Sequence, residues 1–309
     1  MSVPTPTLSY ATPYRRSTFA RMMRILSRLR QASSSPVAFL ILLFYTAMAL
    51  LPLYLMIVTS VTRVGVTLDL SRLQWVPRHI VWQNFAEFFG MMSGVVWRWL
   101  LNTCIIALLP TSVSLFFSAM AGYALAKIQF PGRRTIYWLI IAVMAVPAFV
   151  TLIPLYQMMF RFGWFNSFFA LIVPRIAGIG GVFLFTQFMQ TLPTELIQAA
   201  RIDGASEWSI FWRIILPMAR PVLAVMFLLD FVGAWNDFFW PYLVTNAREM
   251  MTMQVGLMSL IGVDQGATRQ MDYGVTMAGA LITSLPVIVL FIALQRFFIK
   301  GLTIGAVKG

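Results

Sequence analysis

The stretch Glu195–Pro221, which reads ELIQAARIDGASEWSIFWRIILPMARP, is the longest polar interruption between apolar segments in the second half of the chain. Its local signals predict a helix, a sharp turn and a second helix. Thr194 can cap the first helix. Asp203-Gly204 is a turn signal, because glycine adopts positive φ without a steric penalty. Ser206 can then start the second helix.

The helix before this turn is expected to be amphipathic. Leu196, Ala199 and Ala200 fall on one face at helical spacing. A short, rigid, amphipathic element between two apolar segments is suited to docking into a partner. The alternative is a solvated loop with a single helical turn.

The composition predicts an all-α, polytopic membrane protein. The 309 residues are 60% hydrophobic and 11% charged, whereas a soluble domain is nearer a quarter charged. The net charge of +13 is explained by the positive-inside rule, so no nucleic-acid partner is expected. One cysteine, Cys104, and one histidine, His79, exclude a Cys/His metal site within the chain. No nucleotide-binding or hydrolase motif occurs, so we expect no catalytic residue and no ATP site on this chain.

Six apolar segments are each long enough to cross a hydrocarbon core of about 30 Å. These predicted spans lie near Val37–Ser60, Trp99–Ala126, Ile136–Met158, Ser167–Met189, Pro221–Trp240 and Tyr273–Phe298. Pro147, Pro154, Pro174 and the glycine run from Gly178 to Gly181 can break helices, which is tolerated where a segment lines a cavity. Kinked and packed helices are the alternative. In the second span, small residues recur at every fourth position and predict close helix packing: Ser114, Ser118, Gly122 and Ala126.

The lysines and arginines predict the topology and the domain boundaries. Most of them lie on the side of the N-terminal arm, which indicates that both termini and the Gly204 loop are cytoplasmic. We therefore expect a basic cytoplasmic arm (1–35), a first span and outer loop (36–97), a transmembrane domain (98–299) with a cytoplasmic loop at 191–220, and a cytoplasmic tail (300–309). The arm is either an interfacial helix on anionic lipid or only a topology signal.

The fifth predicted span contains unexpected polar residues. An Asp at membrane depth costs roughly 2.5–3.5 kcal/mol on insertion scales, so the deeper Asp230 should face a partner or a water-filled path. Asp237 is nearer the outer end of the segment, where an interfacial position is the alternative. Asp230 has no obvious partner in the sequence unless Arg175 is close. Trp235, Asn236 and the aspartates together suit a sugar, whose apolar face stacks on aromatic rings while its hydroxyls are hydrogen-bonded. The alternative is an aromatic belt at the membrane surface.

The polar interruption also carries a resemblance to a known family. Glu195-x-x-Gln198-Ala199-Ala200-x-x-Asp203-Gly204-Ala205, followed by Ile214-x-Leu216-Pro217, resembles the EAA loop of ATP-binding-cassette (ABC) importer permeases. The resemblance implies that this coupling loop docks into a cytoplasmic ATPase. The implied coupling residues are Glu195, Gln198, Ala199, Ala200, Asp203, Gly204, Ala205, Leu216 and Pro217. The family usually has Glu at the position of Gln198; either another glutamate substitutes or the docking is less electrostatic.

Three further stretches extend the resemblance over about Trp97–Gly309. They are the YALAK…FPGR run at 123–133, the WNDFFWP run at 235–241, and the C-terminus from QR at 295 to GLTIGAVKG. The last two are similar to carbohydrate-uptake permeases of the maltose-system type, specifically the six-helix partner subunit. The resemblance implies a type I ABC importer transmembrane domain in a bacterial cytoplasmic (inner) membrane.

The same resemblance implies the assembly. The chain forms half of a pore with a second, different permease subunit, two ATP-binding subunits carry ATP and Mg²⁺, and an extracytoplasmic solute-binding protein delivers the solute. Membrane lipid is a further partner, and this chain itself carries no cofactor. The implied solute path contains Trp235, Asn236 and Asp237. Asp230 lies outside the shared run, and its depth in the apolar segment adds it to the predicted path. Glucosides, trehalose-like disaccharides, oligosaccharides and glycerol phosphate esters all remain open as solutes.

Other classes remain open from the residues alone. A proton-coupled secondary transporter would use Asp230 or Asp237, but such folds tend to contain internal repeats, which the sequence does not show. A membrane-embedded enzyme would need more titratable groups than the spans offer. Within the importers, a peptide or amino-acid permease is the nearest competitor.

Overall fold

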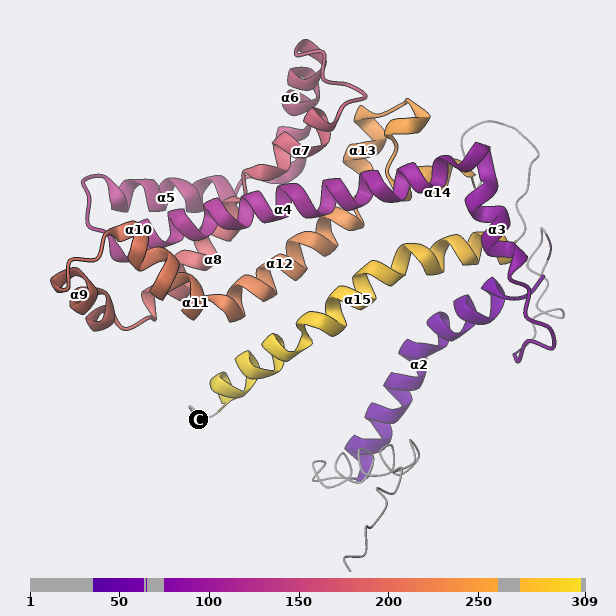
Figure 1. The fold of residues 1–309 in the computed structure, drawn as a ribbon, viewed down its shortest axis with the longest axis horizontal. Helices are drawn as coiled ribbons and strands as arrows, with labels where there is room; N and C mark the ends of the chain where they lie inside the picture. Colours follow the sequence, from indigo (N-terminus) through magenta and orange to yellow (C-terminus); the bar gives the residue numbers. More distant parts are fainter. Residues whose placement is uncertain (1–35, 64, 66–74, 261–272, 307–309) are drawn as a thin grey trace, which may run out of the picture. The chain divides into compact units, whose positions relative to one another are not determined.

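The computed structural model describes residues 36–63, 65, 75–260 and 273–306, and this part of the chain is helical, with no strand. The N-terminal arm and the tail residues 307–309 lie outside it. The longer helices are α2 (Pro36–Ser60), α3 (Gln83–Gly90), α4 (Val95–Lys127), α5 (Arg133–Met144), α6 (Ala148–Arg161), α7 (Phe168–Ile176), α8 (Ile179–Gln190), α9 (Thr194–Ile202), α12 (Arg220–Trp235), α14 (Met253–Leu260) and α15 (Tyr273–Ala306) (Figure 1). Short elements join them: η2 (Met91–Gly94), α10 (Glu207–Ile210), η3 (Phe211–Ile215), α11 (Leu216–Met218), α13 (Phe239–Val244) and η4 (Arg248–Met250).

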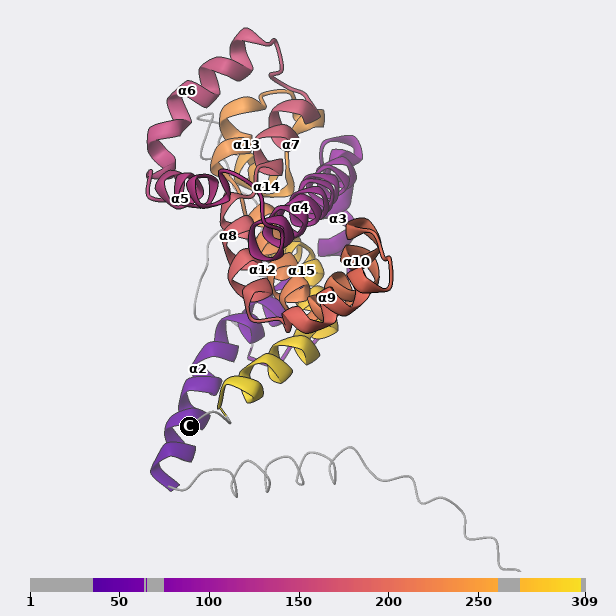
Figure 2. The same ribbon diagram turned by 90° about the vertical axis from the view of Figure 1, so that its left-hand side faces the viewer.

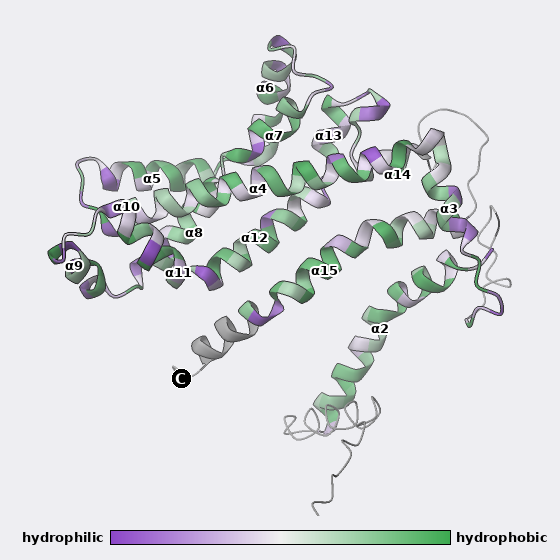
Figure 3. Ribbon diagram, viewed as in Figure 1, coloured by the Kyte–Doolittle hydropathy of each residue, from purple (hydrophilic) through white to green (hydrophobic). Residues whose placement is uncertain are grey.

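The described residues contain four helical segments that are long and apolar enough to cross a membrane, or six if two bent pairs each count as one span. The four are α2, α4, α7 with α8, and α15. The bent pairs are α5 with α6, and Glu207–Met218 with α12. Figure 3 shows hydrophobic residues running along most of these helices. The predicted membrane architecture is therefore present, with two spans that are not simple rods.

The predicted third span is broken at its proline. α5 and α6 meet at 93°, and Figures 1 and 2 show that the chain changes direction between them. Pro147 has no N–H to continue the helix of α5, and it precedes the first residue of α6. Pro154 and Pro174, in contrast, lie inside α6 and α7 without ending them.

The predicted fifth span also ends earlier than expected. α12 stops at Trp235, and α13 begins at Phe239, so Asn236 and Asp237 lie in the connection between two helices. At its other end, α12 is bent by 76° from the preceding helical segment. The extension to Trp240 was wrong, because the apolar run continues through a turn that composition alone does not reveal.

The small residues of α4 permit a close approach of α7 and α8, as predicted. A Cβ on Gly122 would lie 2.5 Å from the Phe185 Cβ, and one on Gly178 would lie 2.1 Å from the Ser114 Oγ. Ser118 donates a hydrogen bond to the Gly178 carbonyl (3.1 Å), beside the break between α7 and α8. The stripe thus accommodates two helices and supplies a partner to a carbonyl at the broken backbone.

The connection between α2 and α4 contains the helix α3, and one of its aromatic residues is buried. Phe88 is fully buried, and a Cβ on Gly279 of α15 would lie 2.5 Å from its ring. Phe88 therefore packs in the core, close to Gly279 of α15. In the separate unit that ends at Leu55, α2 is exposed and apolar nearly all round, which is typical of a lone membrane span.

Candidate functional site

The turn of the coupling loop has the geometry that its sequence predicts. Gly204 has φ +79°, in the left-handed region. The Ala205 N–H donates to the Ala200 carbonyl (2.9 Å), and the Gly204 N–H donates to the Arg201 carbonyl (3.0 Å). This pair of bonds is a Schellman motif, which ends α9 in a single fixed direction. A Cβ at Gly204 would meet no atom within 4 Å, so the requirement for glycine comes from the backbone angle.

The two helices of the coupling loop, α9 and α10, differ in how their N-termini are capped. Ser206 caps the second helix as predicted, because its Oγ accepts from the Ser209 N–H (3.2 Å). The prediction that Thr194 caps α9 was wrong: α9 starts at Thr194 and has no side-chain cap. Instead, the Thr194 Oγ1 accepts from the Lys127 Nζ (3.0 Å), which also donates to the Leu192 carbonyl (2.6 Å). The last residue of α4 thus supports the entry of the coupling loop.

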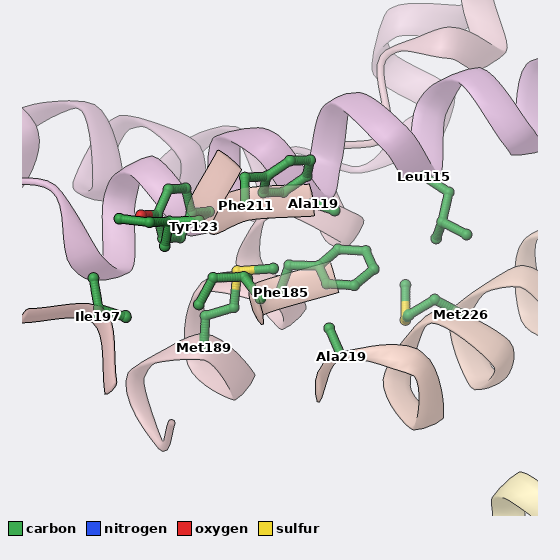
Figure 4. Close-up of a cluster of buried hydrophobic side chains, with 11 residues drawn as sticks. Leu115, Ala119, Tyr123, Phe185, Met189, Ile197, Phe211, Ala219 and Met226 are labelled. Atoms are coloured by element: carbon green, nitrogen blue, oxygen red, sulfur yellow. The ribbon is translucent and has the colours of Figure 1, made fainter. Parts of the chain in front are cut away.

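Apolar side chains pack the base of the coupling loop against three of the longer helices (Figure 4). Ile197, Ile210, Phe211 and Ile215 of the loop are each at most 2% exposed. They belong to one buried cluster with the following residues of α4, α8 and α12 and the residue before α12: Leu115, Ala119, Tyr123, Phe185, Met189, Ala219 and Met226. The loop is therefore a packed extension of these helices, and a displacement of its base has to displace them as well.

A polar network joins the same elements. The Tyr123 hydroxyl of α4 donates to Glu207 Oε2 (2.6 Å). Arg201 donates from Nε to Glu207 Oε1 (2.6 Å) and from a terminal nitrogen to Oε2 (3.2 Å). The hydrogen bond to Glu207 holds the pKa of the Arg201 guanidinium above its usual range. Glu207 thereby links both sides of the Gly204 turn to a transmembrane helix.

The opposite face of the coupling loop is exposed and partly apolar. Leu196 is 49% exposed and Ile202 is 86% exposed, while Gln198, Ala199 and Asp203 are also exposed. The predicted face of Leu196, Ala199 and Ala200 is therefore split, since Ala200 packs on the buried cluster and Leu196 points away from it. Exposed apolar side chains beside a rigid turn are a typical docking surface.

A second polar site, which we call the polar centre, comprises Arg175, Asp230, Asn236 and Asp237. A terminal nitrogen of Arg175, near the end of α7, lies 2.6 Å from Asp237 Oδ2. Asp237 also accepts from the Trp240 N–H at the start of α13 (3.4 Å). Helix breaks adjoin both partners, after Ile176 and after Trp235. The ion pair thus joins two interrupted helices.

The other residues of the predicted solute path have different surroundings. Asn236 is exposed, and Asp230 is half-buried and interacts electrostatically with Arg175. Trp235 is 1% exposed, and its Nε1 donates to the Thr283 carbonyl of α15 (2.9 Å). In this conformation Trp235 packs between α12 and α15, whereas Asp237 pairs with Arg175 and Asp230 interacts electrostatically with the same arginine. The sequence did not assign the roles of Tyr123 and Lys127, and it considered Arg175 only as a partner of Asp230, whereas the structure pairs it with Asp237. For Arg175, its rarity as a charge within an apolar segment was the available signal.

The fold and these sites define a class of membrane transport subunit. Residues 114–304 match the family described as "Binding-protein-dependent transport system inner membrane component", and the chain belongs to this family. It is the permease component of an ABC importer, a transport subunit and not an enzyme.

Named relatives support this class. The chain is 37% identical over 251 residues to the arabinooligosaccharides transport system permease protein AraQ of Halalkalibacterium halodurans, covering 81% of this chain and 86% of that protein. It is 31% identical over 272 residues to the sn-glycerol-3-phosphate transport system permease protein UgpE of Yersinia pestis, covering 85% and 94%. A bacterial ABC transporter involved in alginate import shares the fold, with a TM-score of 0.75 at 23% identity over 93% of this chain and all of the matched chain.

Proposed function

We propose that the coupling loop docks into a cytoplasmic ATPase subunit and transmits its movement to a pore for a sugar or sugar-like solute. The observation that carries this proposal is the two-sided construction of the loop. Its outward face presents Leu196 and Ile202 beside the Gly204 turn, while its base is buried against α4, α8 and α12. A loop with only a connecting role needs neither feature.

The proposed docking surface comprises the outward residues of α9 and the turn. Ile202 is the apolar anchor, because its side chain is almost fully exposed at the last position of α9. Glu195, Gln198, Ala199 and Asp203 surround it, and the small Ala199 allows a partner backbone to approach. Ala200, Ala205 and Leu216 act from the inner side and hold the turn on the buried cluster. Pro217 follows Leu216 within α11.

The proposed topology places both termini and the coupling loop in the cytoplasm of a bacterial cell, as the lysine and arginine distribution favours. Two ATP-binding subunits carry ATP and Mg²⁺, and a second, different permease completes the pore. An extracytoplasmic binding protein delivers the solute to the opposite side. Closure of the ATPases displaces the coupling loop, and the packed base carries α4, α8 and α12 with it between two access states.

The polar centre is the proposed contact for the solute. Arg175, Asn236 and Asp237 offer planar donors and acceptors that match vicinal hydroxyl groups. The named relatives transport arabinooligosaccharides or sn-glycerol-3-phosphate, so a sugar or a related polyol ester is the favoured solute. Asp230→Asn tests this assignment. The variant should assemble and retain stimulated ATP hydrolysis but lose uptake; unchanged uptake would remove Asp230 from the path.

Isolation of the complex tests the proposed assembly. The tagged chain is extracted from its native membrane in mild detergent, and every co-eluting protein is identified. Co-elution of an ATPase, a second permease and a solute-binding protein is expected. Elution of the chain alone or as a homodimer would contradict the proposed assembly.

Site-directed cross-linking tests the docking surface itself. In a background in which the single cysteine is replaced (Cys104→Ser), Ile202→Cys should cross-link to the ATPase subunit. Arg161→Cys is the matched control, because Arg161 is also exposed but is the last residue of α6, outside the coupling loop. Equal cross-linking by both variants would show that proximity to the ATPase is not specific to the coupling loop.

A further inference from the structure

A pocket of about 540 Å³ lies where the turn between α4 and α5 meets the end of α8. Neither the coupling loop nor the polar centre contributes to it. Its polar lining residues are Gln129, Arg133, Arg134, Thr135, Tyr137 and Gln190. Two guanidinium groups, two hydroxyl groups and two amides therefore surround one space.

The lining carries positive charge without a compensating carboxylate. Arg133 uses one N–H for the Ile128 carbonyl (3.3 Å), which holds its side chain against the turn and leaves further donors. Arg134 is exposed. None of the ion pairs formed among the described residues involves either arginine. The Tyr137 hydroxyl accepts from Gln187 Nε2 of α8, so its own proton is available for an acceptor in the pocket. These groups fit a phosphate.

An apolar stripe continues from this pocket along α5. Ile136, Leu139 and Val143 are 44%, 59% and 49% exposed, and their spacing places them on one helical face. Trp138 is also exposed (57%), on another face of α5, and is of the type that concentrates at membrane interfaces. A cationic pocket at the end of an apolar stripe matches an amphiphile, whereas free phosphate would use only the pocket.

We propose that this pocket binds the phosphate headgroup of an anionic phospholipid, whose acyl chains lie along the exposed face of α5. Arginine suits this role because its planar fork donates to phosphate at two points. Basic pockets between membrane helices on the cytoplasmic side are suited to anionic headgroups. The site does not depend on the role of the coupling loop, so it can be tested even if the docking proposal fails.

Native mass spectrometry of the purified full-length protein, with its co-purifying subunits, tests the site by titration with dioleoylphosphatidylglycerol or dioleoylphosphatidylcholine. The wild type should retain one phosphatidylglycerol more tightly than phosphatidylcholine. Arg133→Gln with Arg134→Gln should weaken that binding about 30-fold, since each arginine near an anionic lipid contributes about 1 kcal/mol and 1.4 kcal/mol is tenfold. Arg213→Gln with Arg220→Gln is the matched control, because these exposed arginines of the coupling loop lie outside the pocket. Equal binding by both double variants would overturn the proposal.

Two further measurements distinguish a bound lipid from other occupants of the pocket. Leu139→Gln with Val143→Gln should weaken phosphatidylglycerol binding while leaving the pocket charge intact; unchanged binding, together with displacement by inorganic phosphate, would identify a free-phosphate site and overturn the lipid assignment. Loss of a co-purifying subunit from the Arg133→Gln, Arg134→Gln variant with lipid binding intact would identify a protein contact and overturn it as well.

Because loss of arginines can also alter topology, a photoactivatable phosphatidylglycerol applied to the unaltered protein provides an independent test. Labelling should concentrate in residues 129–143. Labelling that avoids this segment would exclude the site.

Discussion

The coupling loop and the polar centre are each held by an arginine–carboxylate pair, but the two pairs depend on different surroundings. Arg201 and Glu207 are six residues apart on either side of one turn, with side-chain exposures of 37% and 44%. Arg175 and Asp237 come from separate helices, with exposures of 28% and 20%. Exposed pairs contribute about 0–1 kcal/mol, whereas removing one partner of a desolvated pair leaves an uncompensated charge. The coupling loop should therefore rely on its backbone turn and apolar base, and the polar centre on its ion pair.

The largest effect should follow a change of the backbone turn. We expect Gly204→Val to leave the protein inserted in the membrane but to abolish ATP-coupled uptake, because a β-branched residue is strongly disfavoured at φ +79°. Uptake and ATP hydrolysis of the reconstituted complex are the measurements. Normal uptake would remove this turn from the mechanism.

Two controls assign that effect to the backbone. Gly204→Asn should retain most of the uptake, because asparagine tolerates the left-handed region and the site has open space for a side chain. Gly163→Val imposes a similar strain at φ +66°, also with open space, in the connection between α6 and α7. Loss of coupling in Gly163→Val as well would indicate general destabilisation.

The next largest effect should come from the polar centre. Arg175→Gln leaves Asp237 without its partner. We expect the free energy of unfolding to fall by about 2 kcal/mol, which is less than the cost of about 3–5 kcal/mol for breaking a fully buried pair. Arg175→Gln with Asp237→Asn should be more stable than Arg175→Gln alone, since Asp237 then carries no unpaired charge. Thermal unfolding of the purified chain in detergent measures both. Equal stability of the single and double variants would show that the pair is too hydrated to matter.

Prediction from the sequence succeeded where structure is local. The Gly204 turn and the Ser206 cap depend on residues within one helical turn of each other, and the break at Pro147 follows from a missing N–H. The hydrogen bonds that attach the coupling loop to α4 were not predictable, because they join positions that are far apart in the chain. Tyr123 reaches Glu207 across 84 residues, and Lys127 reaches the start of α9 across more than 60.

The WND run (Trp235–Asp237) shows that a short sequence motif does not predict the surroundings of its own residues. Trp235, Asn236 and Asp237 are adjacent in sequence, yet the structure separates them into a packed ring, an exposed amide and an ion-paired carboxylate. Their spread follows from the end of α12 at Trp235, since beyond that point neighbouring side chains no longer keep helical spacing. Composition predicted a continuous span there, because Phe238, Phe239 and Trp240 continue the apolar run beyond the end of α12.

An intermediate effect is expected within the coupling loop. Tyr123→Phe removes the hydrogen bond from α4 to Glu207, and such a bond to a charged group contributes about 1.5–3 kcal/mol, less where water reaches the carboxylate. We expect uptake per ATP hydrolysed to fall several-fold while the complex still assembles. Arg201→Gln should have a smaller effect, because its pair with Glu207 is exposed. The reverse order would show that the loop is held by its surface pair and not by its link to α4.

The smallest effect should come from Gln198→Glu, which introduces the glutamate that ABC importer permeases usually carry at this position. Gln198 is exposed on the outward face of α9 and makes no hydrogen bond among the described residues that would be lost. A carboxylate there adds charge assistance to any contact with a basic group of the ATPase, so assembly and uptake should stay within about twofold of the wild type, as expected for an exposed site. Co-purification of the ATPase at increasing salt is the sensitive measurement, because only the charged variant should gain salt dependence. Loss of assembly would contradict this expectation and would mean that the partner surface is complementary to the neutral amide. The outward face would then contribute specificity through hydrogen bonding, while Ile202 supplies the apolar contact.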